Sequence, residues 1–270
     1  MMRFMSRWVA VAAAVLTASS AAWVSAQPAA PPAKAATGDT GQPRIDPQAL
    51  ELFKKMCDYL ESAKAFRLRV NLREEVMLLT GQKLVYDSWA QVSVRRPDRL
   101  RTSRHGILED LEVYYDGKSV AMFRRQPNLY AVTPAPPTIG GMFDAMRSQF
   151  DISIPGSDLL YADAYAGMIE GVTDAFYVGL EDISGSLAHH LGFRHTDVDW
   201  QVWIQEGEKP LPVKYIITTK WMTGAPSFDV AMTDWDLAPR LDDATFAFLP
   251  PAGAQRIEFK RPPDLPAAYR

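Results

Sequence analysis

Cysteine is almost absent from this sequence of 270 residues, in which Cys57 is the single example. A chain with one cysteine forms no internal disulfide, so its stability has to come from a hydrophobic core. Cys57 shares a helical spacing with Phe53, Met56 and Leu60. This setting predicts a small buried core residue rather than a reactive thiol, which needs a basic and partly exposed environment.

Motifs of the common catalytic classes are missing as well. The sequence has no Gly-x-Ser-x-Gly, no phosphate-binding loop and no His-Glu-x-x-His. A basic excess is also missing, since the formal net charge is −3, and this argues against a nucleic-acid partner. We expect no catalytic residues and no cofactor. A hydrolase is the weaker alternative, because the spacing of its candidate carboxylates is equally that of solvated strand faces: Glu181, Asp182, Asp197 and Asp199.

Long hydrophobic runs are confined to the N-terminus. Two arginines precede an apolar stretch, residues 8–16, that is too short to span a bilayer as a stable helix. Val24-Ser25-Ala26 is a typical small-residue cleavage site, which predicts a signal peptide over residues 1–26 and export to the periplasm. The alternative, an uncleaved anchor, is disfavoured by the polar residues 17–20. No cysteine lies near the cut, so a bacterial lipid anchor is excluded, and no later stretch predicts a stable transmembrane segment.

The next segment separates this peptide from a folded domain. Residues 27–45 are rich in alanine and proline with few large apolar side chains, which predicts a disordered linker. Asp46-Pro47 then signals a helix start, and the helix is expected to run to about Lys64. We expect a single domain over residues 46–259 and a loose, proline-rich tail over residues 260–270.

Alternation of apolar and polar residues dominates positions 66–133. In the first predicted strand the apolar residues share one parity and most of the charged residues the other, which indicates one dry and one wet face. Turn signals such as Asp116-Gly117 separate the strands that follow. The apolar parity places Leu72 toward the core, together with Leu68, Val70, Val76 and Leu78.

Helical signals interrupt this pattern before strands resume. Ile139, Met142, Phe143, Met146 and Phe150 recur at the spacing of an amphipathic helix, and a further helix is predicted over residues 159–169. Alternation returns from residue 176 to residue 232. The order of elements predicts an α+β fold, in which helices are segregated from a large antiparallel sheet that curves strongly.

Three histidines are the candidates for a metal cluster. His189 and His190 are adjacent on a predicted strand, so their side chains point to opposite faces. His195 would lie about 20 Å from His189 along a straight strand, and a turn near Gly192 is what would bring the two together. We therefore expect ordinary strand histidines and no metal site.

Two stretches resemble a known protein family. The first runs from Thr196 to Ile204 and continues with Gly207 and Lys209-Pro210-Leu211-Pro212, and the second is Arg96 to Leu100 with Tyr115-Asp116-Gly117-Lys118. The chain resembles the DUF2092-type predicted periplasmic proteins from residue 45 to residue 259. That family is similar to a wider superfamily containing the periplasmic outer-membrane lipoprotein carrier, its receptor and envelope regulators of sigma factors. The resemblance implies an open half-barrel whose concave face is covered by helices, and it supplies no catalytic residues.

Tryptophan and methionine are the positive signal for binding. Seven tryptophans and eleven methionines are generous for this length, and methionine adapts to irregular apolar partners. With the implied half-barrel, this predicts an apolar ligand such as a lipid or acyl chain. The residues expected to contact it are Leu72, Val76, Met142, Phe143, Met146 and Trp200. The alternative is a regulatory module of the envelope that binds another protein and has a packed interior.

A run of arginines stands out in an acidic protein. It comprises Arg95, Arg96, Arg99, Arg101 and Arg104. One interpretation is the wet face of a strand pair. The other is that the first four form a patch for an anionic headgroup or for a protein partner.

Overall fold

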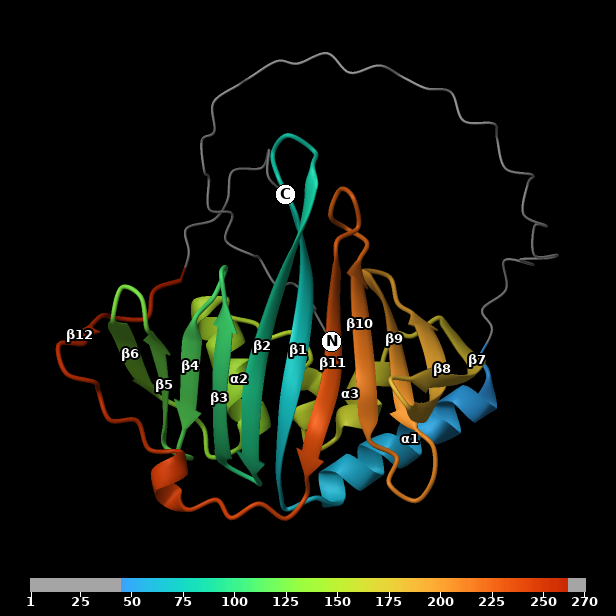
Figure 1. The fold of residues 1–270 in the computed structure, drawn as a ribbon, viewed down its shortest axis with the longest axis horizontal. Helices are drawn as coiled ribbons and strands as arrows, with labels where there is room; N and C mark the ends of the chain where they lie inside the picture. Colours follow the sequence, from blue (N-terminus) through green and yellow to red (C-terminus); the bar gives the residue numbers. More distant parts are fainter. Residues whose placement is uncertain (1–44, 262–270) are drawn as a thin grey trace.

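A single sheet of twelve strands organises the computed structural model, which describes residues 45–261. The strand order is β12-β6-β5-β4-β3-β2-β1-β11-β10-β9-β8-β7 (Figure 1). Neighbouring strands are antiparallel except for β12 and β6, which are parallel. Strands β1 to β6 and β7 to β11 each form a meander, and the β1–β11 ladder joins the two. The predicted signal peptide, and the predicted linker before Ile45, lie outside the described residues.

The strands are β1 (Ala65–Met77), β2 (Lys83–Arg95), β3 (Arg99–Gly106), β4 (Leu111–Tyr115), β5 (Ser119–Arg124), β6 (Leu129–Pro134), β7 (Asp174–Ile183), β8 (Ser186–Arg194), β9 (Val198–Gln205), β10 (Pro212–Thr219), β11 (Ser227–Asp236) and β12 (Gln255–Arg256). The helices are α1 (Pro47–Ser62), α2 (Ile139–Phe150) and α3 (Ala164–Ile169). Two 3-10 turns, η1 (Ser157–Leu160) and η2 (Asp243–Thr245), complete the list.

The first helix begins where the sequence predicts. The Asp46 carboxylate accepts a hydrogen bond from the backbone N–H of Gln48 at 2.9 Å, and Pro47 occupies the first turn, where its missing N–H costs nothing. Phe53 and Met56 are fully buried in the core beside Cys57. Burial raises the pKa of the Cys57 thiol to about 12, so the thiolate is suppressed and the side chain acts as a small apolar residue.

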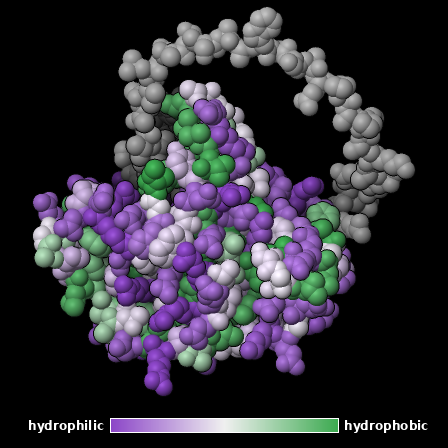
Figure 2. All heavy atoms as spheres, in the orientation of Figure 1, coloured by the Kyte–Doolittle hydropathy of each residue, from purple (hydrophilic) through white to green (hydrophobic). Residues whose placement is uncertain are grey.

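Residues of alternating parity on β1 face opposite sides of the sheet, as predicted. Phe66, Leu68 and Val70 are buried on the inner face, and Leu72 is half-buried there, whereas Arg69 and Arg73 are exposed. Helices α2 and α3 lie behind the sheet in Figure 1, on its inner side. Hydrophilic residues cover most of the opposite, outer face in Figure 2. This confirms the predicted α+β fold, a large curved antiparallel sheet with helices on one face.

The helix predicted over residues 159–169 is two elements. A 3-10 turn, η1, ends at Leu160, and α3 begins at Ala164 after an extended Tyr161. The reason is local, since the Asp163 side chain accepts a hydrogen bond from the Ala166 N–H and caps a new helix there. The structure also corrects the end of α1, which stops at Ser62 because Ala63 is extended.

Both edges of the sheet are partly covered by flanking segments. At one edge, β12 pairs with β6, and the Phe248 ring that precedes it packs against the rings of Tyr114, Phe123 and Tyr130 on the outer face. At the other edge, the Asp46 N–H donates to the Ala175 carbonyl of β7 at 3.0 Å. Covered edges present fewer unpaired backbone groups to other chains.

Candidate functional site

An apolar cavity of about 150 Å³ lies between the inner face of the sheet and the segment that follows α2. Four successive inward residues of β1 line it, from Phe66 through Leu68 and Val70 to Leu72. At about 3.3 Å per residue, the cavity follows the strand for about 20 Å. Phe143 of α2 and residues 154–160 form the opposite wall. We call this space the inner cavity and residues 154–160 the lid segment.

A buried ion cluster borders the inner cavity. Arg104 lines the cavity, and its guanidinium donates to Glu74 at 3.0 Å, to Glu109 at 2.9 Å and to the Ser88 hydroxyl at 3.1 Å. Glu74 is 5% exposed, and burial raises the pKa of its carboxyl, an effect that Arg104 only partly offsets. Sequence reasoning missed this cluster, although Glu74 falls on the apolar parity of β1 and was the available signal.

The lid segment holds a polar side chain that sequence reasoning also missed, Asp158. Burial raises the pKa of Asp158 to about 6, and the nearby Arg147 opposes that shift. Arg96 donates to the Leu160 carbonyl at 2.8 Å, while its Nε and second terminal nitrogen are buried without a hydrogen-bond partner. Such an unsatisfied buried donor costs free energy, so the contact that holds the lid segment is imperfect.

Two of the six residues predicted to contact a ligand line the inner cavity. These are Leu72 and Phe143. Met142, Met146 and Trp200 are buried at 4% exposure or less, but they pack in the core away from the cavity lining. Trp200, for example, stacks on Phe193 with ring centroids 3.8 Å apart. Val76 is half-buried on β1 and lies beyond the cavity lining.

The arginine run is distributed over both faces of the sheet. Arg99 contacts Asp98 at 2.8 Å, and Arg101 contacts Glu112 at 3.2 Å. Arg95 bonds to Asp243 and lies over the Phe246 ring, 5.3 Å from its centroid. Arg96 instead turns inward to the lid segment, and Arg104 joins the buried ion cluster. Carboxylates therefore neutralise three of the four arginines that the sequence suggested as a patch.

The strand histidines have ordinary polar partners. His190 contacts Glu181 at 2.6 Å and Gln201 at 2.9 Å, and His189 contacts the Tyr177 hydroxyl at 3.2 Å. Within residues 45–261, no group of three or more histidine, cysteine or acidic side chains is arranged to hold a metal ion.

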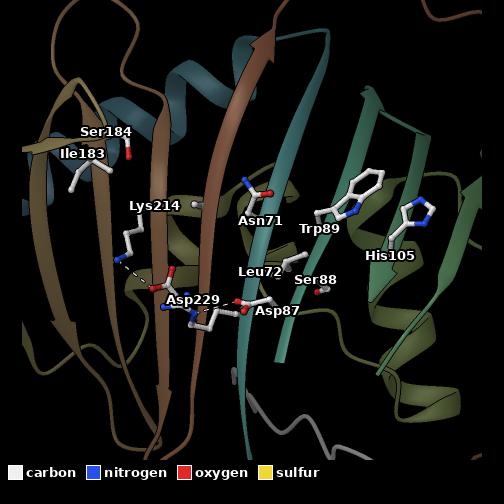
Figure 3. A pocket seen from close by; sticks show the side chains of 12 residues that line it. Asn71, Leu72, Asp87, Ser88, Trp89, His105, Ile183, Ser184, Lys214 and Asp229 are labelled. Atoms are coloured by element: carbon white, nitrogen blue, oxygen red, sulfur yellow. Dashed lines mark hydrogen bonds and ion pairs between the residues drawn. The ribbon is translucent and has the colours of Figure 1, made fainter. Parts of the chain in front are cut away.

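The outer face of the sheet is hollowed as well. An open groove of about 550 Å³ lies across the central strands (Figure 3). It is lined by Asn71, Leu72, Arg73, Asp87, Ser88, Trp89, His105, Ile183, Ser184, Lys214, Asp229 and Ala231. We call it the outer groove. Because Ile183 ends β7 and Ser184 follows it in the turn, four strands away from β11, the twisted sheet has to curl around this space.

Comparison with known proteins identifies a family. A family model described as "Predicted periplasmic protein (DUF2092)" matches residues 49–260. A search of curated proteins returned no match. In the part of the chain that the structure describes, no helix combines the length and apolar character needed to cross a membrane.

Several solved structures are similar at low sequence identity. An uncharacterized conserved protein from Thermus thermophilus aligns with a TM-score of 0.48 and 13% identity, covering 78% of this chain and 99% of that one. The lipoprotein LppX from Mycobacterium tuberculosis aligns with a TM-score of 0.42 and 13% identity, covering 73% and 100%. A LolA superfamily protein from Nitrosomonas europaea aligns with a TM-score of 0.38 and 11% identity, covering 74% and 97%. Because the family model spans most of the chain, this protein belongs to the DUF2092 family of predicted periplasmic proteins.

Proposed function

We propose that this protein is a non-enzymatic binder or carrier of an apolar ligand, such as a lipid acyl chain, in the periplasm. The observation that carries the proposal is the shape and lining of the inner cavity. It follows β1 from Phe66 to Leu72 between apolar side chains, and its polar side chains are few. A long, narrow, apolar space suits a hydrocarbon chain, because burial of each methylene contributes about 0.8 kcal/mol.

The size of the inner cavity indicates that binding requires movement. A cavity of about 150 Å³ holds a benzene-sized molecule, whereas pockets for larger ligands measure roughly 300–1,000 Å³. The lid segment is the element best placed to move, since Pro155-Gly156 precedes η1 and Gly156 has a left-handed φ of 80°. Outward displacement of this segment would widen the cavity without breaking any strand pairing of the sheet.

The ion cluster gives the proposed ligand an orientation. Arg104 is already engaged by Glu74 and Glu109, so an anionic headgroup would have to compete with two carboxylates. We infer that the hydrocarbon part enters the cavity and that the headgroup stays outside it.

A regulatory module that binds another protein is the second candidate. The observation in its favour is the edge strand β7, where Val178 is 57% exposed and Leu180 is 45% exposed. An apolar edge strand can pair with an extended segment of a partner. This candidate needs no ligand in the inner cavity.

Native mass spectrometry of protein purified from its own host is the primary test. A co-purifying lipid is the expected result, and a mass equal to that of the polypeptide alone would favour the regulatory candidate. Titration with a fluorescent fatty acid locates the site. We expect Phe143→Asp to abolish probe binding, because a carboxylate would face hydrocarbon. Phe150→Asp is the matched control on the same helix, since Phe150 packs on Phe259 outside the cavity. Far-UV circular dichroism separates loss of binding from loss of the fold.

A further inference from the structure

Two similar stacks of side chains lie on the outer face of the sheet, and the outer groove is lined by Trp89 and His105 of the first stack and by Lys214 of the second. Trp89 lies between His105, with ring centroids 4.2 Å apart, and the Arg69 guanidinium, 4.4 Å from the Trp89 centroid. On the other side of the central strands, Trp203 stacks on a histidine, His190, at 4.0 Å, and has the Lys214 ammonium 4.9 Å from its centroid. The two tryptophans thus repeat one arrangement, an indole between a histidine and a cation.

Strand register places these stacks in one row. From one strand to the next across the sheet, the cross-strand partners are His105, Trp89, Asn71, Ala231, Lys214, Trp203 and His190. The centre of the row forms the floor of the groove, because Asn71 and Ala231 are cross-strand partners with short side chains. With strands about 4.8 Å apart, Trp89 and Lys214 are separated by about 14 Å. Figure 3 shows Trp89, Asn71 and Lys214 spread across this space.

Charges in the outer groove are balanced. Arg73 contacts Asp87 at 3.2 Å, and Lys214 contacts Asp229 at 3.2 Å. An anionic or a cationic ligand would therefore meet a repelling charge beside each attracting one. A neutral ligand that donates and accepts hydrogen bonds meets no such conflict, since the carboxylates accept, the cations donate, and the Asn71 amide does both.

We infer that the outer groove is a binding site for a neutral saccharide. Its volume of about 550 Å³ falls in the usual range for ligand sites. Sugar hydroxyls match the paired donors and acceptors. His105 and Arg69 cover the two faces of the Trp89 indole, so its exposed edge, in a side chain that is 37% exposed, is what it offers to the apolar C–H surface of a sugar ring. The groove is open to solvent, so a longer chain can cross the sheet.

This site is separate from the proposed apolar site. The outer groove and the inner cavity lie on opposite faces of the sheet and share a single lining residue, Leu72. Occupation of one does not require occupation of the other, so the saccharide inference stands or fails independently of the proposed function.

Calorimetric titration and tryptophan fluorescence test the inference, with maltotriose, cellotriose and N-acetylated chitotriose as probes. We expect saturable binding of at least one probe with a Kd of about 1 mM or tighter. Ala231→Phe fills the floor of the groove and should weaken binding at least tenfold, and so should Asp229→Asn. Asp199→Ala is the matched control, because Asp199 also faces outward but pairs with Lys220 outside the groove.

Three outcomes would overturn the inference. The first is the absence of saturable binding by all three probes at about 10 mM. The second is binding that survives both groove variants, each shown to be folded by circular dichroism. The third is tighter binding of trigalacturonate or deacetylated chitotriose than of every neutral probe. The cavity variant Phe143→Asp, when folded, should leave saccharide binding unchanged, so failure at one site is distinguishable from failure at the other.

Discussion

The sharpest test of the inner face concerns Arg104, which holds a buried carboxylate. Arg104→Met keeps an apolar stem of similar length but removes the cation that faces Glu74 at 3.0 Å. The side chains of Glu74 and Arg104 are 6% and 14% exposed, so solvent screens the pair weakly. Leaving one member of a buried pair without its partner costs roughly 3–5 kcal/mol of unfolding free energy.

This loss of unfolding free energy should depend on pH, and the direction of the dependence follows from the titration of the Glu74 carboxyl. Burial already raises the pKa of Glu74 in the native protein, and removal of Arg104 raises it further. A group whose folded pKa lies above its unfolded value loses stability as pH rises through the folded value. The variant should therefore be destabilised most at alkaline pH and progressively less as the pH falls and Glu74 takes up a proton, after which roughly 1 kcal/mol remains for lost hydrogen bonds.

Urea denaturation at a series of pH values measures the effect. Arg101→Met is the matched control on the same strand, because Arg101 pairs with Glu112 on the outer face at 38% exposure. We expect the unfolding free energy of this control variant to change by about 1 kcal/mol or less. Equal destabilisation by Arg104→Met at both ends of the pH range would refute the reasoning, since it would mean that Glu74 carries no uncompensated charge in the variant.

Four further predictions concern the cavity, the sheet, the lid segment and the N-terminus. Val70→Phe should fill the inner cavity and reduce fatty-acid probe binding at least tenfold in a protein that stays folded by circular dichroism; undiminished binding would place the ligand elsewhere. Leu72→Ala should lower the free energy of unfolding by roughly 2 kcal/mol, which is the low end for core leucines because Leu72 is half-buried. Arg73→Ala should change it little, and equal denaturation midpoints for the two variants would contradict the assignment of Leu72 to the inner face and Arg73 to the outer face. Asp158→Asn should stabilise the protein more at pH 8 than at pH 4, because the pKa of about 6 makes the ionised carboxylate unfavourable above that value, and a pH-independent difference would contradict it. N-terminal sequencing of the exported protein should begin at Gln27, and an intact Met1 would exclude cleavage.

Alternation was sufficient to predict the sheet and the faces of β1. The alternation of apolar and polar residues within one strand is enough to show which face is buried. Leu68 and Val70 could therefore be assigned inward without knowledge of any partner strand. The same parity could have indicated Glu74 as a buried acid, but this signal was missed, and its partner Arg104 lies on β3, where strand register decides the pairing. The break between η1 and α3 was less accessible, because Asp163 is compatible with a continuing helix as well as with a new cap.

The candidate sites depend on properties that a single sequence does not contain. Whether Phe143 faces a cavity or a packed neighbour is decided by gaps of a few ångströms between α2 and the sheet, and both cases use the same apolar residues. The row of side chains along the outer groove depends on the register of seven strands and on sheet twist. Its residues lie as far apart in the chain as Asn71 and Ala231, and no local pattern connects them.

The position of the β1–β11 ladder has a consequence for how the chain reaches this fold. Within each meander, strands pair with their neighbours in sequence, so those hairpins close short loops and can form early. The β1–β11 ladder instead joins Leu72 to Val230, and β12 pairs with β6 across a similarly wide separation. Closing such long loops costs more chain entropy before any contact compensates for it. We expect the two meanders to appear as separate, faster-forming units, with their joining as the rate-limiting step of folding.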